Sequence, residues 1–498
     1  MPQAQPKRPN ILFILSDDQG YWAMRCAGNR EIETPNLDRL AASGTRFDRF
    51  FCASPVCSPA RATLLTGRIP SRHGVHDWIA GGNALAPDAR HRPGELIEYL
   101  AGQPGYTDYL AGAGYRCGIS GKWHMGDSHH PQKSLSFWSV HATGGGPYYN
   151  APMIRDGQLY HEPRYVTDAI TDNALAWLRE RKADPQPFYL SVHYTAPHSP
   201  WTRENHPAAI YDRYHNDCPF HSLPDGVTPP DWARHVAIPV RNAAERRAIL
   251  SGYYAAVTAM DANIGRILDQ LEADGLRENT LVVFTSDNGM NMGHHGVYGK
   301  GNATYPLNMF EESVRVPFIA SHPGRIPQAA VNADLVSQYD FLPTILDYAG
   351  APPPNDPALP GKSFASALLG KSAQDRGPVV VVDEYGPVRM IRDREWKYVH
   401  RFGLGPNELY HLSEDPAESH NLSGDPARRA VEDDMRRRLA EWFTRYADPD
   451  RDGGRLPVSG KGQIGLCGPA GAGKPAFAKG EIANLIDEAF GTPSNPAS

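Results

Sequence analysis

The stretch "NILFILSDD", residues 10–18, carries the pattern that decides the fold. It is a short continuous apolar run that ends in two adjacent acids, Asp17 and Asp18. Such a run is typical of a strand whose two faces are both covered, as in a parallel sheet. Its apolar part, from Ile11 to Leu15, is too short for the hydrophobic region of a signal peptide. We therefore interpret it as a core strand rather than a targeting segment.

Strand and helix patterns alternate along most of the chain. Strand patterns recur in "YRCGISGKWH", "PFYLSVHYTAPHSPW", "NTLVVFTSDNG" and "RVPFIASHP". Helix patterns, with apolar residues about 3.6 positions apart, span Tyr165–Arg181 and Asn242–Asp274. A third helix is predicted after Thr34, a favourable N-cap, with Pro35 in its first turn and Gly44 at its end. The alternation predicts an α/β fold with a large, mostly parallel sheet and a site at the carboxyl ends of its strands.

The pattern changes from about residue 378. Four short runs, "VVVVDEY", "VRMIRD", "WKYVHRF" and "NELYHL", predict a small antiparallel sheet, and "RRAVEDDMRRRLAEWFTRY" predicts an amphipathic helix. We expect a catalytic domain over residues 1–375, the small sheet with its helix over 376–450, and a Gly/Pro-rich arm or tail over 451–498. The arm is the part that we expect to mediate any homo-oligomer.

The composition argues against several classes of function. The chain has 498 residues, a formal net charge of -6 and no long basic run, which argues against nucleic-acid binding. No apolar run approaches the length of a membrane span, and we expect a cytoplasmic protein. The six cysteines show no CxxC pair and no Cys/His spacing typical of zinc sites, so the sequence predicts neither a disulfide framework nor a zinc site.

Acidic pairs follow two of the predicted strands. Asp17 and Asp18 end the first strand, and Asp287 and Asn288 end "NTLVVFTSDNG". Adjacent carboxylates repel each other unless a cation neutralises them. Three carboxylates and an amide oxygen suit Ca²⁺ or Mg²⁺. Each pair alone could be a turn or a helix cap, but two pairs at two strand ends favour a metal site.

Basic side chains follow other predicted strands. Lys122 and His124 lie in "GKWHMG", His193 and His198 in "HYTAPHSP", and Lys300 in "YGKGN". Taken alone, Lys122 would be a solvated surface lysine and His198 a loop histidine bonded to the backbone. Together with a metal at one sheet edge, these side chains would form a cationic pocket for a tetrahedral oxyanion.

The stretch "FCASPVCSPARATLLTGR", residues 51–68, contains the most specific motif of the chain. It resembles the signature of the type I sulfatases, Cys-x-Pro-x-Arg followed by Leu-x-Gly-Arg. The matching residues are Cys57, Pro59, Arg61, Leu65, Gly67 and Arg68. The acidic pairs and the basic residues occur along the chain in the same order as in the family. The resemblance covers roughly residues 9–420. It implies the alkaline-phosphatase-like α/β sandwich, with a smaller C-terminal antiparallel sheet.

The resemblance implies a role for Cys57 that its position alone does not reveal. In this family a generating enzyme oxidises the signature cysteine to formylglycine, an aldehyde. One hydroxyl of the aldehyde hydrate then attacks sulfur and displaces the alcohol. The other hydroxyl loses its proton, and sulfate leaves by C–O cleavage. The cation of the family is usually Ca²⁺, and Mg²⁺ or Mn²⁺ would also suit these residues.

The resemblance also implies roles by motif position. Arg61 would hold the hydrated aldehyde, and Lys122 and Lys300 would neutralise sulfate oxygens. His124 would take the proton in the elimination step, and His198 would protonate the leaving oxygen as general acid. The cation would be bound by Asp17, Asp18, Asp287 and Asn288.

The resulting prediction is an enzyme, a sulfuric ester hydrolase acting on small organic sulfate monoesters with an aryl, alkyl or sugar group. The alternative on the same site is a phosphonate monoester or phosphodiester hydrolase, although such relatives carry Asp-His where this chain has Asp287 and Asn288. A third hypothesis, from another class, is nucleotide binding by "GPAGAGKP", residues 468–475, where Pro475 replaces the Ser or Thr of a P-loop.

Two further expectations concern the surroundings of the site. Residues 127–165 and 201–240 are expected to be long loops above it, because long aromatic-rich loops in enzymes are usually functional. His193 is expected beside the pocket in a structural role, and His295 is a candidate for the pocket lining.

Overall fold

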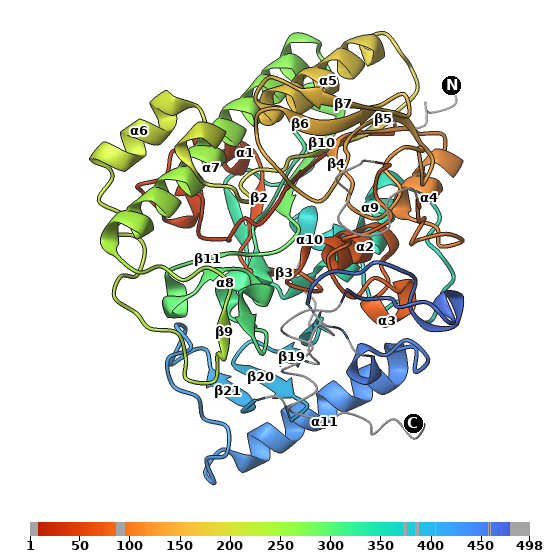
Figure 1. Cartoon of the computed structure of the whole chain (residues 1–498). Helices are drawn as coiled ribbons and strands as arrows, with labels where there is room; N and C mark the ends of the chain where they lie inside the picture. The colour runs from red at the N-terminus through yellow and green to blue at the C-terminus, as the bar shows by residue number, and fades with distance from the viewer. Residues whose placement is uncertain are drawn as a thin grey trace.

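A ten-stranded mixed sheet forms the centre of the molecule (Figure 1), in the order β16-β2-β15-β10-β1-β8-β4-β5-β6-β7. The computed structural model describes residues 8–85, 95–371, 376–383, 388–403, 405–456, 458 and 460–478. The strands of this sheet are β1 (Asn10–Ser16), β2 (Thr45–Phe47), β4 (Arg116–Lys122), β5 (Leu135–His141), β6 (Ala151–Arg155), β7 (Gln158–Glu162), β8 (Phe188–His193), β10 (Thr280–Ser286), β15 (Phe318–Ser321) and β16 (Ala330–Asn332). Its five middle strands, from β10 to β5, are parallel neighbours, as the sequence predicted.

Helices cover both faces of the sheet. One face packs against α1 (Pro35–Ala42), α5 (Val166–Arg181) and α7 (Ala243–Ala273), and the other against α2 (Cys57–Thr66), α4 (Tyr106–Gly112) and α9 (Phe341–Ala349). Strand β1 shows why its sequence is continuously apolar. Leu12 and Ile14 belong to the core on one side, whereas Ile11, Phe13 and Leu15 belong to the core on the other. A strand with two covered faces has no position left for a polar side chain.

A small antiparallel sheet and a helix lie at one end of the molecule, at the bottom of Figure 1. Its strands, in spatial order, are β18 (Val379–Asp383), β19 (Val388–Arg392), β20 (Trp396–Arg401) and β21 (Glu408–His411). Helix α11 (Arg429–Tyr446) covers one face with Met435, Leu439 and Phe443. Met390 and Val399, on the opposite face, join the core of the large domain, so the small sheet is packed between the domain and α11.

The shorter elements connect these layers or border the site. They are α3 (Pro70–His73), α6 (Ala208–Asp217), α8 (Glu311–Val314), α10 (Ala365–Leu368), β3 (Phe50–Phe51), β9 (His235–Val236), β11 (Asn291–Met292), β12 (Tyr298–Gly299), β13 (Thr304–Tyr305), β14 (Arg315–Val316) and β17 (Val336–Ser337). Within the ranges given above, no helix combines the length and the apolar composition that crossing a membrane requires.

Two expectations about long loops were partly wrong: both segments contribute to the lining of the cavity above Cys57, but neither is a loop throughout. Residues 127–165 contain β5, β6 and β7, which extend the large sheet. Trp138 and Val140 of β5 are buried, and the strand pairs in parallel with β4, so tertiary packing decides its conformation. Residues 201–240 contain the helix α6 and the short strand β9.

The Gly/Pro-rich segment at the C-terminal end packs, in its described part, against its own chain. Gln463 is fully buried, and its backbone N–H donates to the Trp78 carbonyl at 2.7 Å. Its side-chain Nε2 donates to the Gly74 carbonyl at 2.8 Å, and its Oε1 accepts from the His76 N–H at 2.9 Å. This segment therefore supports the loop that follows α3. A homo-oligomer formed through it stays a prediction.

Candidate active site

The two acidic pairs meet at the carboxyl ends of neighbouring strands. Strands β1 and β10 are parallel and in register, with Ser16 opposite Ser286, so the residues that follow each strand are adjacent. Oxygen atoms of Asp17, Asp18 and Asp287 all lie within 4.8 Å of one another, and all three side chains are buried. We call these three residues the strand-end cluster. The sequence predicted its residues and its place.

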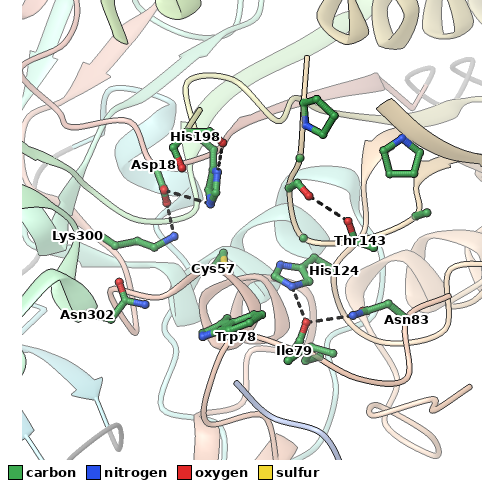
Figure 2. Close-up of a pocket in the computed structure, with 18 of the residues that line it drawn as sticks. Asp18, Cys57, Trp78, Ile79, Asn83, His124, Thr143, His198, Lys300 and Asn302 are labelled. Carbon is green, nitrogen blue, oxygen red and sulfur yellow. Dashed lines mark hydrogen bonds and ion pairs between the residues drawn. The ribbon is translucent and has the colours of Figure 1, made fainter. Parts of the chain in front are cut away.

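Three cationic side chains surround the strand-end cluster. Lys122 Nζ lies 2.6 Å from Asp17 Oδ2, and Lys300 Nζ lies 2.6 Å from Asp18 Oδ1. Figure 2 shows Lys300 reaching Asp18 beside Cys57. A third contact joins Arg61 Nε to Asp287 Oδ2 at 2.8 Å. The three carboxylates thus face three cations, all withdrawn from bulk water.

Burial and charge oppose each other at these carboxylates. Burial raises the pKa of Asp17 well above its ordinary value, although Lys122 opposes it. Burial also disfavours ionisation of Asp18 and Asp287. Lys300 beside Asp18 and Arg61 beside Asp287 outweigh this effect of burial. They hold the pKa values of Asp18 and Asp287 below their usual range. Positive charge is therefore what keeps carboxylates ionised in this buried place.

The residues present fit a divalent cation. Asp17 Oδ1 and Asn288 Oδ1 are buried and have no hydrogen-bond partner, which is costly unless another group satisfies them. The donor set consists of oxygens, as Ca²⁺ and Mg²⁺ prefer. Since three carboxylates already balance three cations, a divalent ion would leave two positive charges. Such an excess suits an anionic substrate.

Cys57 occupies the floor of the cavity, at the first position of α2. Pro59 is tolerated in the first turn because its missing N–H would have no partner within the helix. Arg61 lies one turn further on, which directs its guanidinium to Asp287. Burial raises the pKa of the Cys57 thiol, so an unmodified cysteine here is a neutral thiol and a weak nucleophile.

Two histidines flank Cys57 across the cavity (Figure 2). His124 Nε2 lies 3.0 Å from the Ile79 carbonyl. His198 Nδ1 lies 2.7 Å from the Ser199 carbonyl, and its Nε2 lies 3.7 Å from Asp18 Oδ2. Burial lowers the pKa of His198 to about 4, although Asp18 opposes it, and burial also lowers the pKa of His124 well below its ordinary value.

A glycine run holds these imidazoles in place. A Cβ atom at Gly144 would lie 2.1 Å from the His124 ring, and one at Gly145 would lie 3.1 Å from the His198 ring. Only glycine allows the backbone at Gly144 to approach the ring so closely. The backbone at Gly144 and Gly145 therefore packs directly against the two histidines that flank Cys57.

The other two histidines that the sequence singled out, His193 and His295, lie outside the cavity lining. His193 ends β8 in the core, with Nδ1 3.1 Å from the Lys122 carbonyl and its ring against Phe13. His295 stacks on Phe310 at 3.7 Å between ring centroids, and its Nε2 lies 3.2 Å from Glu312 Oε2. The expectation that His295 lines the pocket was wrong, because its ring is held against Phe310 and Glu312, outside the cavity lining.

The cavity above Cys57 has a volume of about 710 Å³. Asp18, His124, His198 and Lys300 line it together with Cys57, whereas Arg61 and Lys122 lie beneath its surface. Its walls include residues that no motif indicated, among them Trp78, Ile79, Asn83, Thr143 and Asn302 (Figure 2). They come from three segments of the chain, at residues 78–83, 143 and 302, and no motif or spacing in the sequence marks them.

Comparison with known proteins decides the family. The family model described as Sulfatase matches residues 9–351, which include every residue of the strand-end cluster and Cys57. The chain belongs to the sulfatase family. A second model, N-sulphoglucosamine sulphohydrolase, C-terminal, matches residues 293–445. The predicted enzyme class, a sulfuric ester hydrolase, and the predicted α/β fold are thereby confirmed.

Individual relatives cover most of the chain. N-acetylglucosamine-6-O-sulfatase of Bacteroides thetaiotaomicron is 28% identical, over 90% of this chain and 88% of that protein. Arylsulfatase A of Homo sapiens is 30% identical, with 84% of each chain covered. A protein solved in complex with its substrate, D-glucosamine-2-N,6-O-disulfate, superposes with a TM-score of 0.72 at 26% identity, over 90% of this chain and 99% of that one.

The P-loop-like run at residues 468–475 lies outside both matched ranges. Its first residues form a short 3-10 turn, Gly468–Gly471. Within the described part of the chain, the segment before this turn is not a strand, whereas a P-loop connects a strand to a helix. Nucleotide binding by this run is therefore not supported.

Proposed function

We propose that the protein hydrolyses organic sulfate monoesters with an aldehyde formed from Cys57 and a divalent cation held by the strand-end cluster and Asn288. The observation that carries this proposal is the position of Cys57 at the cavity floor, next to Lys300 and Asp18. The aldehyde, once hydrated, would supply the hydroxyl that attacks sulfur. The cation would polarise a sulfate oxygen and lower the pKa of that hydroxyl. We propose Ca²⁺, since the donor atoms are all oxygens.

Cationic side chains of the chain bind the sulfate group. Lys300 lines the cavity within reach of both Cys57 and Asp18, so its ammonium neutralises a sulfate oxygen above the floor. Lys122 lies beneath, on Asp17, and adds positive charge from below. Arg61 holds Asp287 and, from one turn along α2, would hold the modified side chain at position 57. These groups are fixed before substrate arrives, which is how a site stabilises developing charge without reorganising.

Two proton transfers fall to the histidines. His124 is a neutral imidazole at neutral pH, because burial lowers its pKa, and it is therefore suited to take a proton at position 57. His198 lies on the opposite side, beside Asp18, where it would protonate the leaving oxygen. An anionic sulfate near His198 would favour its protonated form and oppose the effect of burial. Lys300 also lines the cavity, but the neighbouring carboxylates outweigh burial and raise its pKa, which makes it a weaker acid than His198 and only the second candidate for this role.

The names of the relatives support the substrate class. One relative is named as a sugar sulfatase and another as an arylsulfatase, so the organic group that we propose is a ring with a sulfated hydroxyl. Phosphonate monoester or phosphodiester hydrolysis is less favoured, because the chain carries Asn288 after Asp287 and its named relatives are sulfatases. We also propose that a generating enzyme converts Cys57 to the aldehyde and that the protein is cytoplasmic.

A substrate panel tests the proposed function. One preparation is assayed with 4-nitrophenyl sulfate, a sugar 6-sulfate, a phosphonate monoester and a phosphodiester, beside a matched Cys57→Ala preparation. We expect the sulfates to have the highest kcat/KM and Cys57→Ala to lose turnover of all four while remaining folded. A phosphonate or phosphodiester preferred over both sulfates would contradict the proposal, as would full activity of Cys57→Ala.

A further inference from the structure

Among the described residues, the lysine and the carboxylate that line the active-site cavity lie at its floor, and the walls add one histidine, His161, besides the two that flank Cys57. Among the described residues that line it, the aspartates, glutamates, lysines and arginines comprise only Asp18 and Lys300, which lie 2.6 Å apart and neutralise each other. Both belong to the site that would hold the cation and the sulfate. The walls around this floor therefore offer no arginine, lysine or carboxylate in the described part of the chain.

The walls combine apolar surface with uncharged polar groups. The apolar side includes Trp78, Leu159, Trp201, Ile238 and Tyr298, which come from five separate segments. The polar side chains on the walls include Asn83, Thr143, Asn150, Ser199 and Asn302. In Figure 2, Trp78, Asn302 and Thr143 lie around Cys57. Ligand sites of this kind bury a ring against flat apolar surface and orient it with a few hydrogen bonds.

Trp78 is held rigidly enough to act as a fixed surface. Its backbone N–H donates to Asp77 Oδ1 at 2.7 Å, and its carbonyl accepts from the Gln463 N–H at 2.7 Å. A Cβ atom at Gly462 would lie 3.0 Å from Cζ2 of the indole, so the C-terminal segment is packed against the ring. A ring supported in this way loses little freedom when a ligand packs on it.

The charge pattern decides which substrates the cavity can hold. A carboxylate or second sulfate on the substrate would leave water for a wall whose described residues include no lysine or arginine to balance its charge, and burying an anion in this way is costly. An uncharged ring meets no such cost and gains contact with the apolar wall. The cavity is large enough for the whole organic group, since small-molecule sites span about 300–1,000 Å³.

We propose that this cavity selects sulfate monoesters whose organic group is an uncharged ring, that Trp78 is the surface on which this ring packs, and that substrates with a second anionic group are rejected. The inference rests on the proposed sulfatase activity and adds the class of substrate to it. An uncharged sugar and an uncharged phenol share the required chemistry, and the assay distinguishes them.

A matched pair of sugars tests the charge rule. N-acetylglucosamine 6-sulfate and D-glucosamine-2-N,6-O-disulfate carry the same reacting group and differ at nitrogen, which is acetylated in one and sulfated in the other. We expect kcat/KM for the monosulfate to exceed that for the disulfate by on the order of tenfold or more, the effect of one unpaired buried group. The ratio should fall in Asn302→Arg, which adds a cation to the wall, and persist in the matched control Asn302→Gln.

A second series tests the packing surface. Trp78→Ala should raise KM for ring substrates more than it lowers kcat, and Trp78→Phe, which keeps an aromatic ring, should restore most of the affinity. Comparison with 4-nitrophenyl sulfate shows whether the phenol or the sugar ring packs better. Loss of kcat with KM unchanged in Trp78→Ala would overturn the assignment, because it would indicate a structural effect on the catalytic groups.

The outcomes separate this inference from the proposed function. A wild-type protein that cleaves neither sugar sulfate nor aryl sulfate would contradict the sulfatase proposal itself. A protein that cleaves the disulfate as fast as the monosulfate, or faster, would leave the proposed function standing and overturn the charge rule.

Discussion

Two clusters of metal-ligating side chains in this molecule look alike by distance and differ in chemistry. The strand-end cluster lies at the carboxyl ends of β1 and β10. A second cluster, here called the small-sheet cluster, consists of His295, Glu312 and Glu418. In each, the three candidate ligand atoms lie within 4.8 Å of one another.

Partners and access distinguish the two clusters. In the small-sheet cluster, Lys397 Nζ lies 2.6 Å from Glu418 Oε1, and His295 Nε2 lies 3.2 Å from Glu312 Oε2. None of its three members is among the described residues that line the active-site cavity. In the strand-end cluster, Asp18 lines the cavity floor. Each cluster has one buried carboxylate oxygen without a hydrogen-bond partner, but Glu418 Oε1 lies 2.6 Å from Lys397 Nζ, whereas Asp17 Oδ1 lies 3.8 Å from Arg61 Nη2. Proximity of the ligand atoms alone therefore does not distinguish a candidate metal site; an oxygen without a close cation and access for substrate do.

The largest expected difference concerns turnover. Asp287→Ala removes a carboxylate that would hold the cation and deprives Arg61 of its nearest carboxylate, at 2.8 Å. We expect kcat/KM to fall by roughly 10⁴-fold or more, since the cation acts on both the sulfate and the attacking hydroxyl. Glu312→Ala, the matched change in the small-sheet cluster, should lower kcat/KM by less than tenfold. Similar losses in both variants would contradict the distinction.

A histidine is associated with each cluster, which gives a second comparison: His198 lies 3.7 Å from Asp18, and His295 belongs to the small-sheet cluster. His198→Ala should slow esters of poor leaving groups by ~10²–10⁴-fold, the usual contribution of a positioned acid, and nitrophenyl sulfate far less. His295→Ala should affect both kinds of ester alike and weakly. The measurement is the slope of log kcat/KM against leaving-group pKa in wild type and both variants. An unchanged slope in His198→Ala would assign the acid to another group, with Lys300 the first candidate.

The sequence predicted the strand-end cluster because its signals are local. Acids directly after a buried strand stay at the strand's end in any register, and parallel neighbours bring such ends together. The wall residues Trp78, Thr143 and Asn302 had no such signal, since loops from distant segments place them. Strand β5 was missed for the same reason, because pairing with β4 fixes it rather than its own pattern. The small-sheet cluster joins residues more than one hundred positions apart and was equally invisible.

The small-sheet cluster should matter more for the stability of the protein than for its activity. Lys397 is fully buried, and its ammonium contacts both Glu418 and Glu311. Lys397→Met would leave Glu418 without its cation, although Glu311 keeps Arg392 at 3.2 Å. Removing one partner of a buried ion pair typically costs about 3–5 kcal/mol of unfolding free energy. Denaturant unfolding measures the loss, and kcat of the remaining folded enzyme should be close to wild type. A stable but inactive Lys397→Met would contradict this assignment.

The smallest expected effect is a pH dependence of stability. Burial raises the pKa of Glu418 from its ordinary 4.5 to about 7, although Lys397 opposes it. The folded protein therefore binds this proton more tightly than the unfolded chain does. The tighter binding of this proton raises the free energy of unfolding fully below pH 4.5. This contribution, about 3 kcal/mol, is lost as the pH rises through 7. Unfolding at pH 5 and pH 8 should show this loss in wild type and a smaller one in Glu418→Gln; equal losses would refute it.

The central claim is that catalysis runs through an aldehyde made from Cys57. Mass spectrometry of the peptide that spans Cys57, measured on preparations of different specific activity toward 4-nitrophenyl sulfate, tests it most directly. The account predicts that activity rises in proportion to the fraction of Cys57 converted from thiol to aldehyde. A fully active preparation in which Cys57 is entirely an unmodified thiol would contradict it.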